Sequence, residues 1–318
     1  MIEVHKLSKY FGERAAIREI SFSIAQGEVV GFLGLNGAGK TTTLRILGCL
    51  LLPTSGTVRV DGLEVAENPY EIRRRIGFLP DTPPLYPEMT VGAYLTFAAR
   101  LRQVPGRDAA ARVAEAEEKT ALSDMHREVI GELSHGYRQR VGVAQAIVHK
   151  PALLILDEPS AGLDPAQIIE MRNLLHGLRG EHTVLISSHF LTEISQTCDR
   201  LLVIQAGELV GQGSEDELAS AMGQGGIIEA EVRGQPAGIA ERLAQLSGVT
   251  RAHRRSTSEA ATVFEITTSA DIRPEVARML VAAGCDLLRL EKSTSRLESI
   301  FMTLTHQPSG DRPSGERQ

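Results

Sequence analysis

The chain has 318 residues, of which 42% are hydrophobic and 23% are charged, and its formal net charge is -6. This composition is typical of a globular protein of about two domains, and the acidic balance gives no electrostatic reason to expect nucleic acid or an anionic membrane surface as the main partner. No stretch approaches the roughly 18 consecutive apolar residues of a membrane span, and Cys49, Cys198 and Cys285 lack metal-ligand spacing. We therefore expect a cytosolic protein with reduced cysteines.

Short apolar runs alternate with helical stretches over residues 1 to about 218, which indicates an α/β sheet. Runs rich in Val, Ile and Leu predict buried strands at residues 28–34, 152–158, 182–188 and 200–213. Residues 55–62 alternate like a hairpin strand and predict an accompanying antiparallel part. Residues 82–150 are rich in helix formers and predict a helical subdomain, in which Thr90 and Asp108 are candidate caps.

A glycine-rich segment, residues 219–226, predicts a linker to a second domain at 227–305. Within that domain the expected order is strand, helix, strand, strand, helix, strand, which is the ferredoxin-like arrangement. A last helix is expected at about 295–304. The tail, residues 306–318, is rich in Pro, Gly and Ser and is expected to be disordered.

The strongest motif is GLNGAGKT, which starts at Gly34, matches the P-loop pattern, and lies between a strand and a helix. Gly37 and Gly39 let backbone N–H groups face phosphate oxygens, and the helix N-terminus adds a partial positive charge. Lys40 is expected to reach the β- and γ-phosphates, and the Thr41 hydroxyl to reach Mg²⁺. A chance glycine-rich turn is a weaker interpretation, because the whole motif and its context match.

Two carboxylates end the apolar strand LLILDE, and a histidine follows the strand TVLISS. Asp157 is expected to hold Mg²⁺, and Glu158 to act as general base on the attacking water. His189 would lie at the same edge of the sheet, where ligands of open α/β sheets bind, and could contact the γ-phosphate. Alone, a histidine at a strand end is more often structural.

A second loop-to-helix junction is LSHGYRQR, residues 133–140. Ser134 is a good helix cap, and Gly136 permits close approach of the backbone, so this helix N-terminus could also bind an anion. On its own, an ordinary capped helix is the commoner interpretation. A functional interpretation of this junction depends on the presence of the P-loop and the acidic strand in the same chain.

Six ordered motifs, from the P-loop to His189, closely resemble the nucleotide-binding subunit of ATP-binding-cassette (ABC) transporters, and the resemblance covers residues 1 to about 218. No guanine-binding N-K-x-D motif of a GTPase is present. The stretch RLESIFMTLT, residues 296–305, is similar to the ATPase subunits of exporters in the gliding-motility, drug-resistance and copper-processing branch.

The resemblance implies that Tyr10 stacks on adenine, that Asp157 and Glu158 are the magnesium and general-base acids, and that His189 is the switch histidine. It implies a phosphate loop made of Gly34, Asn36, Gly37, Ala38, Gly39, Lys40, Thr41 and Thr42.

The junction at residue 133 matches the family's signature loop, in which Ser134, His135 and Gly136 would act on the nucleotide of the partner subunit. The sequence departs from the family at His135 and Tyr137, where LSGGQ has glycine and glutamine. It also has Asp81 where glutamine is common. An aspartate only accepts hydrogen bonds and is shorter, so we keep Asp81 as a candidate magnesium residue.

The resemblance implies an ATPase that uses ATP and Mg²⁺, forms an ATP-dependent head-to-tail homodimer, and powers export through a separate integral membrane permease on whose cytoplasmic face it sits. One alternative is a soluble ABC ATPase that acts on ribosomes or DNA without a permease; a single cassette and the acidic charge speak against it. Another is a regulatory protein that binds ATP but hardly hydrolyses it, against which Lys40, Asp157, Glu158 and His189 speak.

Overall fold

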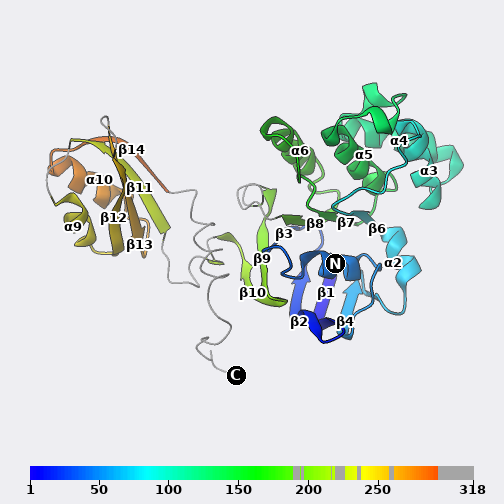
Figure 1. The fold of residues 1–318 in the computed structure, drawn as a ribbon, viewed down its shortest axis with the longest axis horizontal. Coiled ribbons are helices and arrows are strands. Elements are labelled where there is room, and N and C mark those ends of the chain that lie inside the picture. The colour runs from blue at the N-terminus through cyan, green and yellow to red at the C-terminus, as the bar shows by residue number, and fades with distance from the viewer. Residues whose placement is uncertain are drawn as a thin grey trace. The chain divides into compact units, whose positions relative to one another are not determined.

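The structure is a computed structural model that describes residues 1–188, 194, 197–215, 217–218, 226–234, 238–257 and 261–292. Its contacts divide the chain into two units, Met1–Gln212 and Gly213–Gln318 (Figure 1). The expected helix at 295–304 and the expected tail lie outside the described residues, as does the expected linker except for Gly226. In the described part of the chain, no helix has the length and hydrophobicity that a membrane span requires.

A six-stranded sheet in the order β10-β9-β3-β8-β7-β6 is the centre of the first unit. Its neighbouring strands from β9 to β6 pair in parallel. Every residue of β3, β7 and β8 is buried, which is why these strands are uninterrupted apolar runs. The bounds are β3 Val29–Leu33, β6 Ile76–Leu79, β7 Leu153–Asp157, β8 Thr183–Ser188, β9 Arg200–Gln205 and β10 Glu208–Gly213.

The apolar run at residues 200–213 forms two strands, not one. Ala206 and Gly207 join β9 to β10 with φ angles of 47° and 85°. Two consecutive left-handed residues make a tight hairpin turn whose twist suits the flanking strands. Gly207, between the polar residues Gln205 and Glu208, is the sequence signal for this turn.

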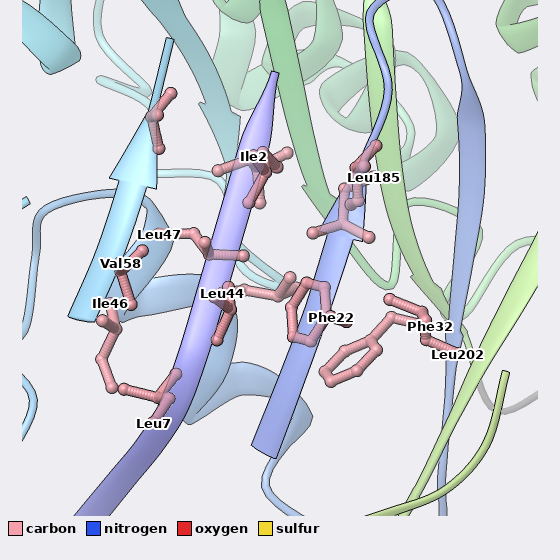
Figure 2. Packing of buried hydrophobic residues seen from close by; sticks show 14 of the residues in the cluster. Ile2, Leu7, Phe22, Phe32, Leu44, Ile46, Leu47, Val58, Leu185 and Leu202 are labelled. Atoms are coloured by element: carbon pink, nitrogen blue, oxygen red, sulfur yellow. The ribbon is translucent and has the colours of Figure 1, made fainter. Parts of the chain in front are cut away.

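A second, antiparallel sheet has the order β2-β1-β4-β5, with β1 Ile2–Phe11, β2 Arg14–Ile24, β4 Ser55–Val60 and β5 Leu63–Glu64. The expected hairpin strand is thus present as β4. The sheet packs against helix α1 (Lys40–Leu47), and Figure 2 shows Leu44, Ile46 and Leu47 among the apolar side chains of β1, β2 and β4. The helix ends earlier than its apolar pattern suggests, because Gly48 caps it and Cys49 has a φ of 56°. This core fixes the start of α1.

The helices of the first unit are α2 Pro69–Arg75, α3 Val91–Leu101, α4 Gly106–Lys119, α5 His135–Ile147 and α6 Pro165–Gly177, with short 3₁₀ turns at Ser123–Met125 and Ile130–Glu132. Thr90 caps α3, because its hydroxyl accepts a hydrogen bond from the Ala93 N–H at 3.3 Å. The expectation for Asp108 is wrong: α4 begins at Gly106, after the cap residue Pro105, so Asp108 lies within its first turn.

The second unit has the expected βαββαβ order, with β11 Gly226–Arg233, α9 Ile239–Ala244, β12 Val249–Thr257, β13 Thr262–Thr268, α10 Arg273–Ala282 and β14 Asp286–Lys292. Its antiparallel sheet has the order β12-β13-β11-β14. Alternate residues of β11 and β13, such as Ala230 and Ile266, pack with Leu243 of α9 and Leu280 of α10. The unit therefore has its own core.

Candidate active site

A cavity of about 540 Å³ opens beside the loop that joins β3 to α1. Residues from five separate parts of the first unit converge on it. They are Phe11, Arg14, Ala16, Leu35, Asn36, Gly37, Gly39, Lys40, Thr41, Thr42, Asp81, Glu158 and Ala161. Of the expected phosphate loop, Gly34 and Ala38 are buried and lie outside this lining.

The loop leaves the N-terminus of α1 open to an anion. Gly37 and Gly39 have φ angles of 79° and 112°, a region that favours glycine. A Cβ atom on Gly39 would lie only 2.6 Å from the carbonyl oxygen of Ala16. Gly39 is the helix cap and makes no side-chain cap hydrogen bond. Backbone N–H groups at this end of the helix thus remain available for phosphate oxygens.

Lys40 is buried and holds two oxygen partners. Its Nζ donates a hydrogen bond to the carbonyl oxygen of Gly34 at 2.6 Å and lies 3.4 Å from the Glu158 Oε1. A buried ammonium needs such partners, because leaving it unpaired in the interior would be costly. The lysine expected to bind phosphate and the glutamate expected to act as base are therefore in direct contact.

Asp157 ends β7, directly before the cavity residue Glu158, and is almost fully buried. Its Oδ1 accepts a hydrogen bond from the Ser187 hydroxyl at 2.6 Å, whereas its buried Oδ2 has no hydrogen-bond partner. Burial raises the pKa of Asp157, the charges of Asp81 and Glu158 add to this, and the nearby hydroxyls of Ser187 and Thr41 oppose it. A buried carboxylate oxygen that lacks a partner, near a threonine hydroxyl, fits a magnesium ion, which prefers oxygen ligands and few protein ones.

Glu158 lies past the end of β7, in a left-handed conformation with a φ of 51°. Its N–H donates to the Ser187 hydroxyl at 3.0 Å, and its carbonyl oxygen accepts from the Ala161 N–H at 3.0 Å. These bonds hold a conformation that non-glycine residues rarely adopt. The two acids diverge because the chain turns after the strand, and not because both belong to one pleated strand.

The cavity contains Phe11, and not Tyr10, the aromatic residue that the sequence resemblance had pointed to. Both side chains are about half exposed. Phe11 ends β1, and its register with β2 shifts between Lys9 and Tyr10. Arg14 at the start of β2 also lines the cavity, and no sequence motif indicated it. The sequence signal for Phe11 was its place before the turn at Gly12, which has a φ of 58°.

Asp81 lines the cavity, and its Oδ1 accepts a hydrogen bond from the Thr82 N–H at 2.8 Å. It thus lies at the same cavity as Lys40 and Glu158. His189 lies outside the described residues.

The second junction, at α5, does not reach the cavity of its own chain: Ser134, His135 and Gly136 are absent from the lining. Ser134 caps the helix, accepting a hydrogen bond from the Tyr137 N–H at 3.4 Å. Gly136 is buried against the Gln167 side chain, which a Cβ atom on the glycine would approach to 2.8 Å. Ser134 and His135 are exposed.

The chain is similar to ATP-binding proteins of ABC transporters in both sequence and structure. A family model described as ABC transporter matches residues 17–161. The bacitracin transport ATP-binding protein of Bacillus licheniformis is 39% identical over 69% of this chain and 71% of its own length. The daunorubicin resistance ATP-binding protein of Streptomyces coeruleorubidus is 34% identical over 96% of this chain and 95% of its own. A dimeric ATP-binding cassette, solved in a post-hydrolysis state with ADP and Pi, superposes with a TM-score of 0.62 at 26% identity, covering 67% of this chain and 98% of that one.

Proposed function

The chain belongs to the ATP-binding proteins of ABC transporters, an ATPase family, and we propose that it hydrolyses ATP as a homodimer to power export through a separate membrane permease. One observation supports this most: Phe11, the loop at residues 35–42 and Glu158 converge on one cavity. Each of the three supplies a different part of an ATPase site.

ATP binding would use the open N-terminus of α1 and an aromatic ring. The N–H groups of the first residues of α1, Lys40 to Thr42, would hold the phosphates, and the Lys40 side chain would reach the β- and γ-phosphates. We assign the adenine-stacking role to Phe11, because this ring lies at the cavity and that of Tyr10 does not.

Magnesium would be held by the Asp157 Oδ2 and the Thr41 hydroxyl, with Asp81 as an additional oxygen donor at the same cavity. When bound, the ion neutralises negative charge that develops on the transferred phosphoryl group. The chain's own contribution is to keep one oxygen of Asp157 unpaired while Ser187 fixes the other.

Glu158 would be the general base. Its carboxylate faces the cavity near Lys40, so a water between it and the γ-phosphate could give up a proton to it. The fixed backbone of Glu158 would keep this carboxylate in position through the reaction. We also propose that His189 contacts the γ-phosphate.

The signature loop would complete the site from the other subunit. Ser134 is exposed at the N-terminus of α5 and does not serve the cavity of its own chain. A head-to-tail dimer would place Ser134 and Gly136 of one chain over the ATP of its partner. The dimeric cassette found with ADP and Pi supports this arrangement.

The permease partner is supported by relatives named for bacitracin transport and daunorubicin resistance. Exposed aromatic residues of this chain offer a surface for such a partner: Tyr86 and Phe97 are 46% and 36% exposed and lie with ring centroids 5.7 Å apart. We propose that the dimer works there, on the cytoplasmic face of the membrane.

Glu158→Gln tests this function. We expect steady-state ATP turnover to fall by about 100-fold or more, because the base is lost, while ATP binding persists and the dimer accumulates. Glu118→Gln, at an exposed position of α4, is the matched control and should keep normal turnover. Unchanged turnover in Glu158→Gln would contradict the assignment of the base. Co-purification with ribosomes in place of a multi-spanning membrane protein would contradict the transport role.

A further inference from the structure

His135 replaces a small residue in the signature loop, and its ring has a defined partner inside the same chain. The Nε2 atom lies 2.9 Å from the carbonyl oxygen of Ala161, in the loop between β7 and α6. The ring also lies over Gly162, where an added Cβ atom would be 3.2 Å from the same Nε2. Gly162 has a φ of 74°, a region that favours glycine, and a side chain there would crowd the ring.

Ala161 connects this contact to the catalytic centre. It lines the cavity of its own chain, and its N–H donates to the carbonyl oxygen of Glu158 at 3.0 Å. A continuous series of hydrogen bonds therefore runs from Glu158 through Ala161 to His135, the residue that follows Ser134.

A second contact supports the same loop from the other side. Gly136 packs on Gln167, whose N–H donates to the Asp164 Oδ1 at 2.9 Å while its side chain accepts from the Asp164 N–H at 3.4 Å. This reciprocal cap fixes the end of the loop at the start of α6. The signature loop and residues 158–164 are thus joined at two points, and a shift of one loop would carry the other.

We propose that His135 is a positioning residue that couples the ATP site of its own chain to the signature loop it presents to the partner subunit. A change at Glu158 and Ala161 when ATP enters one site would move Ser134 over the other site, so the two sites of the dimer hydrolyse ATP cooperatively. The inference rests on the proposed function, because it requires Ser134 to act on the ATP of the partner.

The chemistry of the contact defines the test. A carbonyl oxygen accepts, so Nε2 must carry the proton. Glutamine offers an N–H donor on a side chain of similar reach, whereas methionine has similar length and no donor. His135→Gln should therefore keep the coupling, and His135→Met should remove it. His176→Gln, on the exposed face of α6, is the matched control.

The measurement is steady-state ATP turnover of the full-length protein over a range of ATP concentrations. For wild type, His135→Gln and His176→Gln, we expect a Hill coefficient clearly above one. For His135→Met, we expect it to fall to about one and kcat to fall by about 3- to 10-fold, the size of one hydrogen bond, with little change in half-saturation. The Tm of each variant reports folding, and His135→Asn, which keeps a donor that is too short to reach, provides a second uncoupled variant.

The outcomes separate the two proposals. Wild-type kinetics in both His135→Met and His135→Asn would overturn the coupling role alone, as would a Hill coefficient of one in the wild-type protein, or equal losses in His135→Gln and His135→Met. Absence of ATP turnover in the wild type, or normal turnover in Ser134→Arg, would overturn the proposed function itself.

Discussion

The N-termini of α1 and α5, the two helix ends proposed to bind phosphate groups, are built in opposite ways. At α1 the capping residue is Gly39, which has no side chain and leaves the N–H groups open inside a cavity. At α5 the capping residue is Ser134, whose hydroxyl accepts from the Tyr137 N–H at the long distance of 3.4 Å and which is exposed. The first helix end leaves backbone N–H groups without a side-chain cap, whereas at the second a side chain of the same chain accepts from one of them.

Under the proposed function, this difference would separate the residues that bind ATP from those that act only in hydrolysis by the dimer. The groups at α1 all come from one chain, so ATP affinity should be a property of the monomer. The groups at α5 lie outside the cavity of their own chain, so their contribution should appear only in turnover by the dimer.

Lys40→Met should give the largest effect. It removes the ammonium group that α1 places at the cavity. We therefore expect ATP turnover to fall by about 100- to 1,000-fold and ATP binding to weaken in the monomer. Nucleotide titration and steady-state turnover measure the two quantities. Lys150→Met, at an exposed lysine after α5, is the control and should leave both unchanged.

Ser134→Arg should distinguish the contribution of the α5 N-terminus from that of the α1 N-terminus. The added bulk and charge at the start of α5 should block closure of the dimer, so we expect turnover to fall by about 10- to 100-fold while ATP binding by the monomer stays within about 2-fold. Ser134→Ala removes only the cap, at about 1 kcal/mol of stability, and controls for it. Normal hydrolysis by Ser134→Arg would reduce this junction to an ordinary capped helix.

Phe11→Ala and Tyr10→Ala should differ. Loss of the ring at the cavity should weaken ATP binding by about 5- to 150-fold, since stacking of a base on an aromatic side chain contributes about 1–3 kcal/mol. Tyr10→Ala should change it little. Equilibrium binding of a fluorescent ATP analogue compares the two variants. The opposite ranking would return the stacking role to Tyr10.

Asp157→Asn should stabilise the nucleotide-free protein slightly. Burial raises the pKa of Asp157, so folding favours the protonated form, and the folded state loses stability as pH rises from the ordinary value of 3.8 through the raised one. At pH 7 the asparagine variant should therefore melt about 2–4 °C higher, and the difference should shrink toward pH 4. Thermal unfolding across pH measures this. A lower Tm at pH 7 would contradict the assignment of burial as the dominant effect.

Much of the fold followed from pattern alone. The structure contains the parallel sheet, the β4 hairpin strand, the helical subdomain and the βαββαβ order of the second unit. These elements were predictable because burial of strands and the periodicity of helices determine where apolar residues occur in the sequence. Ser134 capping of α5 was likewise predicted and confirmed.

The differences from the sequence predictions lie where the backbone leaves regular geometry. The resemblance points to Tyr10, whereas Phe11 lines the cavity, and the pairing of β1 with β2 is irregular at this place. Glu158 turns by a left-handed φ that no pattern of residue types specifies. Pro105 starts α4 earlier than the acidic residue at Asp108 suggested.

The contact between Lys40 and Glu158 has a consequence for the resting protein. Without ATP, the ammonium and the carboxylate neutralise each other across 3.4 Å, so neither charge is left alone in a partly buried place. Arrival of the triphosphate would exchange one anionic partner of Lys40 for another and free the carboxylate at the moment a substrate is present. The Glu158 carboxylate would thus become free to act as a base only when ATP is bound. Without ATP, the protein would keep both charges paired and would not activate water.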